Sequence, residues 1–399
     1  MSDAVATARR RAYRIGNQVL LSLTALGAAA ALGGGFLTMA PNRLLSGRPI
    51  GLWHAAGGPA TLGVAAAGLA LVALALAPQR KPLHGLAAAL CAGLLLYLAA
   101  ASGDGAARLA AVPTPLARIS VGAAFWVMLG CAALAIVDAL QRAAAGPAAQ
   151  LLVAAALLAG LAGLAAAGSL DALSLAREYA LRRDGFGAAL LRHVLLVAGS
   201  VGPAVAIGVP LGIAAVRRPR FRAPLFAMLN LLQTIPSVAL FGLLIVPLSA
   251  LGTALPQLSA VGIGGIGVAP ALIALVLYAL LPIARNTAAG IAGVDRAVLE
   301  AGTGMGLSPR QVFWKLELPL AAPVLLSGLR IVTVQTIGLA VVAALIGAGG
   351  LGTFVFEGLG QYAVDLVLLG ALPAIGLALA VNFLLQTIAA ALRGPAARA

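Results

Sequence analysis

The stretch VDRAVLEAGTGMGLSPRQVFWKLELPLAAP, residues 294–323, is a polar interruption in a chain that is otherwise dominated by long apolar runs. Its charged side chains are Asp295, Arg296, Glu300, Arg310, Lys315 and Glu317. A segment with so many charges and glycines cannot lie in hydrocarbon, where every polar group needs an internal partner. We therefore expect a folded polar segment at one face of a membrane.

Local signals predict a short helix in the second half of this segment. Ser308 offers a side-chain cap, Pro309 suits the first helical position, and Gln311 can bond back to the cap residue. A helix should therefore begin at Pro309. Pro319 is expected to end it, because a proline inside a helix loses a hydrogen bond and clashes with the preceding turn.

The first half of the segment has helix signals of its own. Asp295 can cap a helix that runs through Ala301, and the glycines at 302, 304 and 306 would end that helix and turn the chain. The expected product is two short helices around a glycine corner. An ordinary hairpin between two membrane spans would have the same form, so the shape alone does not assign a function.

The composition identifies an integral membrane protein. The 399-residue chain is 62% hydrophobic and 9% charged, with a mean hydropathy of +1.06, whereas soluble proteins carry roughly 25% charged residues. Apolar runs of helix-spanning length predict an all-α integral membrane fold, and the alternating pattern of an outer-membrane barrel is absent. The net charge of +15 comes from basic residues at the ends of these runs, which favours membrane topology and contact with anionic lipid over nucleic acid.

Catalytic and metal chemistry have no support in the sequence. Cys91 and Cys131 lie inside apolar runs without a CxxC spacing or a neighbouring histidine, and the three histidines stand at no ligand spacing. We therefore assign no catalytic residue and no metal site.

The apolar runs predict about ten transmembrane helices. They are expected over about 18–40, 58–77, 83–101, 119–140, 150–168, 193–215, 223–249, 268–285, 321–346 and 366–390. Basic clusters at 9–14 and 217–222 favour the cytoplasmic side, which places both termini and residues 294–320 there as well. A signal peptide is the alternative for the first run, but that run is longer than a typical signal sequence.

A polar interval at 169–192 predicts a division of the chain into two parts. Residues 1–168 would form an N-terminal extension of about five spans, rich in Ala and Gly, with a structural or regulatory role. Residues 169–192 would be an amphipathic, extracytoplasmic connector. Residues 193–399 would form a second unit of five spans that contains the polar segment.

Polar side chains near prolines in the second unit are candidates for a transport pathway. A proline inside a span frees a backbone carbonyl, which a neighbouring helix or a wet cavity must satisfy. The same side chains could instead form helix–helix hydrogen bonds. Arg330, inside a span, is expected to reach the cytoplasmic face or to pair with Glu300 or Glu317. The pathway candidates are Gln233, Thr234, Pro236, Ser237, Tyr278, Asn286 and Gln335.

Four motifs, in order, resemble those of a known transporter family. Glu300-Ala301-Gly302, followed by Gly306 and Leu318-Pro319, is similar to the EAA loop of membrane subunits in ATP-binding-cassette (ABC) importers, with Gly302 in place of the second alanine. LQTIPS at 232–237, LYALLPIARNT at 277–287 and GAGGLG at 347–352 resemble the osmoprotectant permeases, which import glycine betaine, choline and carnitine. The resemblance covers about residues 190–390, and the first five spans resemble an extension found on a subgroup of these permeases.

The resemblance implies a C-terminal five-helix ABC-importer permease core in the bacterial cytoplasmic (inner) membrane, paired with a second permease copy or a paralogue. It also implies cytoplasmic ATPase subunits and an extracytoplasmic solute-binding protein as partners. No GxxxxGK[ST] phosphate loop occurs in this chain, so ATP and Mg would be bound by the partner ATPase and no cofactor by this chain. The EAA-type loop at 294–320 would dock on the ATPase as a coupling helix, through Glu300, Ala301, Gly302, Gly306, Leu307, Ser308, Pro309, Phe313, Leu318 and Pro319.

Three other functions remain as alternatives to osmoprotectant import by alternating access. An ABC permease for another small polar solute, such as an amino acid or an anion, is the main one. A proton-coupled secondary transporter would normally show buried acidic residues inside its spans. A membrane enzyme would show paired carboxylates, a histidine cluster or a nucleophile near a membrane face, and no such group is found.

Overall fold

The computed structural model describes residues 16–42, 45, 47–111, 117–257 and 262–392. The chain divides into two compact units, Met1–Leu181 and Arg182–Ala399. This division falls inside the connector predicted over 169–192. The basic residues at 9–14, 393 and 398, on which part of the predicted topology rests, lie outside the described residues.

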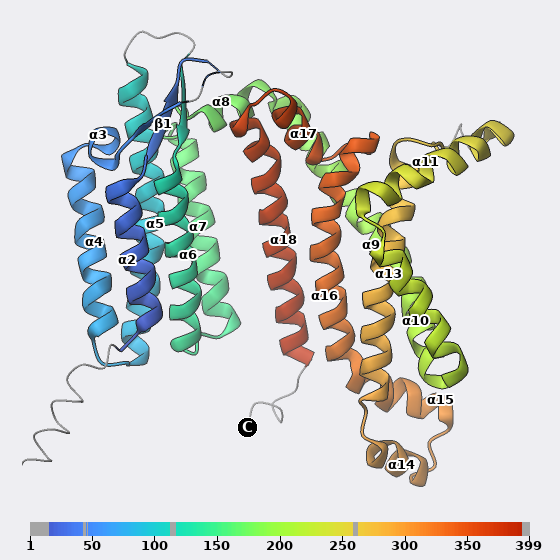
Figure 1. Ribbon diagram of the computed structural model, residues 1–399. Helices are drawn as coiled ribbons and strands as arrows, with labels where there is room; N and C mark the ends of the chain where they lie inside the picture. Colours follow the sequence, from blue (N-terminus) through green and yellow to red (C-terminus); the bar gives the residue numbers. More distant parts are fainter. Residues whose placement is uncertain (1–15, 43–44, 46, 112–116, 258–261, 393–399) are drawn as a thin grey trace, which may run out of the picture. The chain divides into compact units, whose positions relative to one another are not determined.

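The first unit is a helical bundle with a small sheet at one end (Figure 1). Its helices are α2 (Gln18–Gly33), α3 (Leu52–Ala56), α4 (Gly58–Leu76), α5 (Lys81–Ala110), α6 (Ala123–Arg142), α7 (Pro147–Ala166) and α8 (Ser174–Leu181). Its strands are β1 (Leu37–Ala40), β2 (Arg48–Ile50) and β3 (Arg118–Val121), in the antiparallel order β2-β1-β3. The sequence analysis did not predict these strands, because each has only three or four residues.

The first apolar run is helical over a shorter range than predicted. Helix α2 ends at Gly33, and β1 begins at Leu37, so the span expected over 18–40 is too long. Three consecutive glycines at 33–35 explain the end of the helix, since glycine loses more conformational freedom in a helix than any other residue. Residue Met39 instead pairs with Arg48 on one side and with Ile119 on the other.

Asn17 fixes the start of α2 to two other helices. Its side-chain oxygen accepts a hydrogen bond from the backbone N–H of Leu20 at 3.0 Å, and its side-chain amide donates to Asp138 of α6 at 2.8 Å. Its backbone N–H donates to the carbonyl of Ala75 on α4 at 2.8 Å. Leu20, Leu71 and Ala75 are buried together in a cluster at the same place. Helices α2, α4 and α6 are thereby held together at the end of the bundle away from the sheet.

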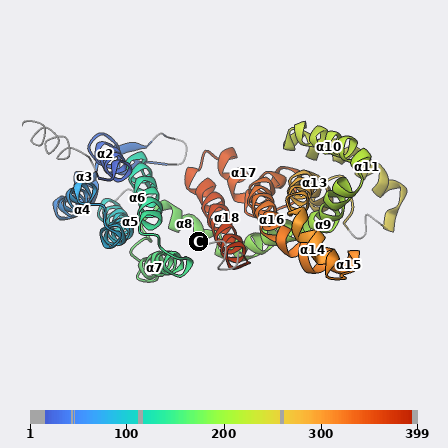
Figure 2. The ribbon, with the colours of Figure 1, turned by 90° about the horizontal axis from the view of Figure 1, so that it is seen from below.

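The second unit is built around long helices. They are α9 (Arg183–Arg217), α10 (Pro219–Thr234), α11 (Ser237–Ala254), α13 (Val268–Ala292), α14 (Arg296–Gly304), α15 (Pro309–Val312), the π-helix η1 (Phe313–Glu317), α16 (Leu318–Val342), the 3-10 helix η2 (Ala343–Ile346), α17 (Gly352–Gly360) and α18 (Val364–Leu392). Helix α13 packs against both α9 and α16, and α18 packs against α16 and α17 (Figure 2).

Small residues let the helices approach α13 closely. A Cβ atom at Gly212 of α9 would lie 2.5 Å from the carbonyl oxygen of Ala284 and 2.6 Å from the Cβ of Thr287, both on α13. A Cβ atom at Gly328 of α16 would lie 2.5 Å from the Cβ of Asn286, also on α13. Glycine at these contacts allows backbone approach that any other residue would prevent, as is common between helices in membranes.

Among the described residues, nine helices are long and apolar enough to cross a membrane. They are α4, α5, α6, α7, α9, α11, α13, the continuous helical run Pro309–Ile346, and α18. They correspond to nine of the ten predicted spans. The tenth is α2, whose 16 residues give a length of about 24 Å, less than the roughly 30 Å of a hydrocarbon core.

Two predicted boundaries in the second unit are wrong. The expected continuous span at 223–249 is two helices, because Ile235 is extended (φ −70°, ψ 125°) between α10 and α11. A residue before a proline is pushed out of the helical region, and Pro236 follows it. Helix α9 begins at Arg183, ten residues before the predicted start at 193, so much of the predicted connector is helical.

The close approach of α9 to α13 makes a testable prediction. Gly212→Leu should lower the thermal-denaturation midpoint of the purified protein, since overpacking a tight contact costs about 1–3 kcal/mol. Gly202→Leu, in the same helix, is the matched control, because a Cβ atom at Gly202 meets no other atom within 4 Å. Equal midpoints for the two variants would contradict this packing.

Candidate functional site

The polar segment begins with helix α14, which is longer than predicted. Asp295 caps it as expected, its side chain accepting a hydrogen bond from the backbone N–H of Ala297 at 2.9 Å. The helix continues to Gly304, three residues past the predicted end at Ala301. Gly302 is buried inside it, and a Cβ atom there would lie 2.4 Å from the Cδ1 of Leu316. The glycine that departs from the EAA pattern is thus the point where α14 packs against the rest of the segment.

The turn after α14 requires glycine at position 306. Gly306 has φ of +84°, in the left-handed region. Its N–H donates to the carbonyl of Thr303 at 2.9 Å, and the N–H of Leu307 donates to the carbonyl of Gly302 at 3.1 Å. These two bonds form a Schellman motif, the common way to close a helix on a left-handed glycine. The predicted glycine corner is confirmed at Gly306.

Helix α15 begins as predicted but does not end as predicted. Ser308 accepts a hydrogen bond from the N–H of Gln311, and the Gln311 side chain accepts one from the N–H of Ser308 at 2.8 Å, forming the capping box expected before Pro309. The prediction that Pro319 ends the helix is wrong. The π-turn of η1 directly precedes this proline, and its changed hydrogen-bond register accommodates the missing N–H inside a continuing helix. Helix therefore runs without a break from Pro309 to Ile346.

An ion pair between a buried glutamate and an exposed arginine joins the polar segment to the helices of the second unit. Glu317, the last residue of η1, is only 3% exposed and pairs with Arg217 at the end of α9. Glu317 was one of two acids named as an alternative partner for Arg330, but it pairs with Arg217 instead. Arg330 is half-buried and has no hydrogen bond or ion pair to another described residue. Sequence reasoning had no signal for the Arg217–Glu317 pair, since the two residues are 100 positions apart.

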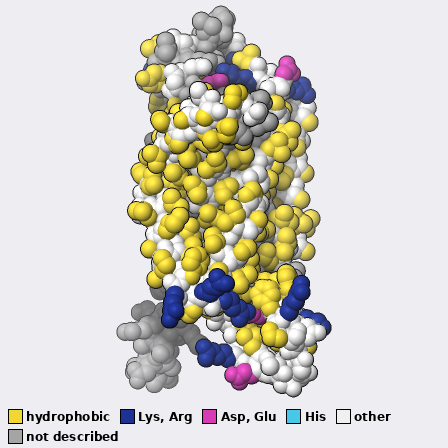
Figure 3. All heavy atoms as spheres, turned by 90° about the vertical axis from the view of Figure 1, so that its right-hand side faces the viewer, with side chains coloured by type: hydrophobic (Ala, Val, Ile, Leu, Met, Phe, Trp, Pro, Cys, Tyr) yellow, Lys and Arg dark blue, Asp and Glu magenta, His cyan; other side chains and the backbone are white. Residues whose placement is uncertain are grey.

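The segment presents large apolar side chains to its surroundings. Met305 is 75% exposed and Trp314 is 59% exposed. Trp314 is braced by Phe313, with ring centroids 5.3 Å apart in an edge-to-face arrangement. Glu300, Arg310 and Lys315 lie exposed on the same segment, and Lys and Arg side chains gather at this end of the unit below a broad hydrophobic band (Figure 3). Apolar anchors with charges around them are typical of a protein-binding surface.

The structure brings together three of the predicted pathway positions at the break between α10 and α11. Pro282 has no N–H, so the carbonyl of Tyr278, four residues earlier, has no helical partner. The side-chain amide of Gln233 donates to that carbonyl at 2.7 Å. The Tyr278 hydroxyl in turn donates to the carbonyl of Ile235, beside Pro236. These groups form helix–helix hydrogen bonds, the alternative role, and a part in a pathway stays a prediction for them.

The other pathway candidates are not joined to this junction. Thr234 is exposed and its hydroxyl donates to the carbonyl of Leu231 at 2.7 Å, while Ser237 is the first residue of α11. Asn286 donates to the carbonyl of Pro282 at 2.8 Å and contacts α16 at Gly328. Gln335 lies exposed on α16. No single cavity among the described residues is shown to collect all seven.

The GAGGLG motif forms a tight loop over the start of α9. Gly347, Gly349 and Gly350 all have positive φ, between 78° and 84°, which explains the glycines. The guanidinium of Arg192 donates to the carbonyl of Ala348 at 3.1 Å, and a Cβ atom at Gly350 would lie 3.2 Å from the Nδ1 of His193. This loop therefore depends on α9 for its position.

Comparison with known proteins matches both halves of the chain. Residues 204–394 match the family described as "Binding-protein-dependent transport system inner membrane component". Residues 14–176 match "ABC transporter permease YehY, N-terminal domain". The two matches together span most of the chain, and the division between the two units falls in residues 177–203, which lie between them.

Several curated proteins are similar to the second half of the chain. The osmoprotectant import permease protein OsmW of Salmonella typhimurium is 40% identical over 212 residues, which are 53% of this chain and 94% of the relative. The carnitine transport permease protein OpuCB of Listeria monocytogenes is 40% identical over 49% of this chain and 82% of its own length. The choline transport system permease protein OpuBB of Bacillus subtilis is 37% identical over 48% of this chain and 82% of its own length.

Among solved structures, the inward-facing methionine ABC transporter MetNI aligns with part of the chain. The alignment covers 52% of this chain and 96% of the MetNI chain, with 24% identity and a TM-score of 0.46. Because this score is below 0.5, the assignment of the second unit rests on the sequence relatives and the family match.

The Arg217–Glu317 pair makes the prediction for this site. Glu317→Ala should increase hydrogen exchange in residues 294–316, because Arg217 then no longer anchors the start of α16 and a hydrogen bond worth about 0.5–1.5 kcal/mol is lost. Glu300→Ala is the matched control, since Glu300 is exposed on α14. Unchanged exchange in the Glu317 variant would show that the pair does not fix the segment.

Proposed function

The chain belongs to the family of binding-protein-dependent transport system inner membrane components, and we propose that it imports a small osmoprotectant such as glycine betaine or choline. Relatives at 35–40% identity carry the names of osmoprotectant, carnitine, choline and glycine betaine permeases. They match the second unit, which holds all four motifs. In this function the chain is a membrane permease subunit and performs no ATP hydrolysis itself.

The observation that carries the mechanism is the unbroken helix from Pro309 to Ile346. A partner that pushes on α15 pushes directly on α16, because no flexible loop separates the two. We place a cytoplasmic ATPase on the exposed face of the segment, with Met305 and Trp314 as apolar anchors. Closure of the ATPase on ATP would then shift the second unit between inward-open and outward-open states.

The ion pair extends this movement to a second helix. Glu317 at the start of α16 holds Arg217 at the end of α9, and α9 carries Arg192, which holds the GAGGLG loop. A displacement of the segment therefore acts on α16 directly and on α9 through a charged contact. Since the two helices also pack on α13, the three would move as a group during alternating access.

The charges at one end of the second unit indicate its orientation in the membrane. The polar segment and the basic turn after α9, with Arg217, Arg218, Arg220 and Arg222, meet at the same end through the ion pair. Basic loops favour the cytoplasmic face. We propose that this end faces the cytoplasm, that both termini do so too, and that an extracytoplasmic binding protein delivers solute to the opposite end.

The buried acids of the second unit argue against a proton-coupled transporter. In the part of the chain that the structure describes, Glu317 and Asp365 are the buried acids of this unit, and neither lies in the middle of a span: Glu317 is in the first third of the continuous helix Pro309–Ile346 and Asp365 is in the first turn of α18. A proton relay needs ionisable groups within the membrane. An ABC permease for an amino acid or an anion would keep the same coupling segment, and only uptake distinguishes that alternative.

The proposed function predicts uptake in proteoliposomes that contain the permease, its partner ATPase and its binding protein. When ATP is supplied on the side of the membrane that carries the ATPase, labelled glycine betaine or choline should accumulate on that same side. Gly306→Trp should abolish most of that uptake, because a side chain strains the left-handed turn and alters the docking face. Gly163→Trp, on the exposed surface of α7, is the matched control. Uptake of amino acids or anions without any quaternary amine would reject the substrate assignment.

A further inference from the structure

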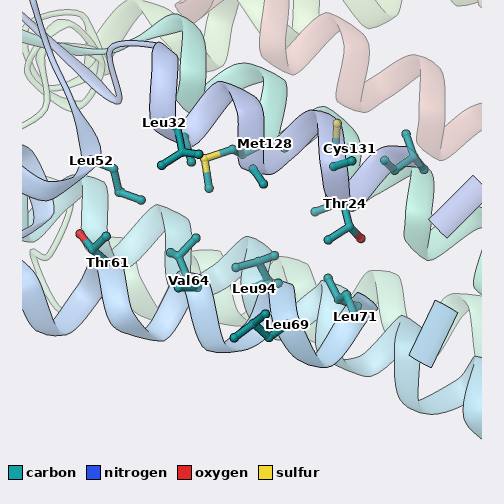
Figure 4. A pocket seen from close by; sticks show the side chains of 18 of the residues that line it. Thr24, Leu32, Leu52, Thr61, Val64, Leu69, Leu71, Leu94, Met128 and Cys131 are labelled. Atoms are coloured by element: carbon teal, nitrogen blue, oxygen red, sulfur yellow. The ribbon is translucent and has the colours of Figure 1, made fainter. Parts of the chain in front are cut away.

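The first unit contains an apolar cavity that the proposed transport function does not use. It lies between α2, α4, α5 and α6 and has a volume of about 720 Å³. Figure 4 shows Leu32 and Met128 on one side of the gap and Val64, Leu69 and Leu94 on the other. Leu32 and Leu69 are 91% and 72% exposed, so the cavity opens at the surface of the unit between α2 and α4.

The cavity exists because α2 and α4 are tied at one end only. Asn17 bonds to Ala75, and Leu20 packs on Leu71, at the end away from the sheet. Nearer the sheet, the facing positions of the two helices include small residues such as Ala28 and Gly68. A Cβ atom at Gly68 would meet nothing within 4 Å. Small residues usually bring membrane helices into contact, but here they leave a gap.

The cavity is lined mostly by apolar side chains, and few polar groups in the lining are free to hydrogen-bond to an occupant. The two threonines of the lining are already satisfied by their own helices, Thr24 donating to the carbonyl of Leu20 at 2.7 Å and Thr61 to that of Gly57 at 2.9 Å. They therefore need no hydrogen bond from an occupant. A polar solute would lose its hydration in this cavity and gain little in return. At the mouth near the sheet, Trp53 and His54 of α3 line the cavity, a placement typical of residues at the level of lipid headgroups.

The cavity is long and apolar, which suits an extended hydrocarbon occupant. Lining residues on α4 extend from Thr61 to Val72, a length of about 16 Å at 1.5 Å per residue. A flexible hydrocarbon chain fits this space.

We propose that the cavity is a binding site for the acyl chain of a membrane phospholipid, which enters between α2 and α4 with its headgroup near Trp53. The cavity lies among helices long and apolar enough to span a membrane, where the surrounding solvent is lipid hydrocarbon. An apolar cavity of this size is dry and binds apolar molecules. The first unit thus holds a lipid that stays with the protein, in contrast to the exchangeable lipid around α7.

The test uses the full-length protein in bilayers that contain phosphatidylethanolamine, phosphatidylglycerol and a trace of a phospholipid with a diazirine in its acyl chain. After illumination, mass spectrometry of peptides should locate adducts on the cavity-facing residues of α2 and α4. Gly68→Phe should reduce these adducts by about fivefold or more, because the ring occupies the space of the chain. Gly163→Phe on α7, which does not line the cavity and also has open space around it, should leave them unchanged.

Adducts on α7 serve as the internal standard, because they report surrounding lipid and confirm that each variant is folded in the bilayer. Ala65→Phe, a second substitution in the lining, guards against misfolding of the first and should give the same loss. Cavity labelling no stronger than that of α7, or labelling unchanged in both lining variants, would overturn the proposal. Crosslinks from the lining to another protein chain would also overturn it.

Discussion

The ion pair between the exposed Arg217 and the buried Glu317 is the contact that holds the start of α16 against the end of α9. Glu317 is almost fully buried at the start of α16, and a buried carboxylate without a partner is strongly unfavourable. The end of α9 and the start of α16 must therefore stay together. Because α15 and α16 form one helix, the pair also fixes the exposed face that carries Trp314. The position of this face, which we propose docks the ATPase, thus depends on a charge that has to be satisfied.

The need to give every buried polar group a partner also explains how the second unit accommodates prolines in its helices. Pro282 interrupts the hydrogen bonding of α13 and Pro236 separates α10 from α11, yet Gln233 and Tyr278 satisfy the carbonyls that are left free. The motifs LQTIPS and LYALLPIARNT each contain a side chain that donates a hydrogen bond to a backbone carbonyl of the other motif. In lipid an unsatisfied carbonyl cannot turn to water, so the two motifs are structurally coupled. If Gln233 or Tyr278 contacts the substrate in another state of the transporter, the carbonyl that it releases must gain a different hydrogen-bond donor.

Local rules predicted the elements that depend on neighbouring residues. The capping box at Ser308, the cap at Asp295 and the turn at Gly306 follow from two to four residues each, and all are confirmed. The continuation of the helix through Pro319 could not be predicted, because a π-turn before it lowers the free-energy cost of a proline at this position. The Arg217–Glu317 pair and the three strands depend on contacts between distant residues, for which a single sequence carries no signal. The apolar cavity escaped prediction for the same reason, since small residues normally indicate contact rather than a gap.

We propose that the segment from 294 to 320 transmits force from an ATPase to α16, and site-specific crosslinking shows whether the segment and the ATPase are in contact. Met305→Cys places a reactive thiol at the exposed turn, whereas Leu359→Cys places one on α17, and Cys91 and Cys131 are buried. In the complex assembled with the partner ATPase, we expect Met305→Cys to crosslink to the ATPase with a short thiol-reactive reagent. Leu359→Cys should form no such crosslink. An assembled complex that hydrolyses ATP, yet forms no crosslink from position 305, would contradict the claim.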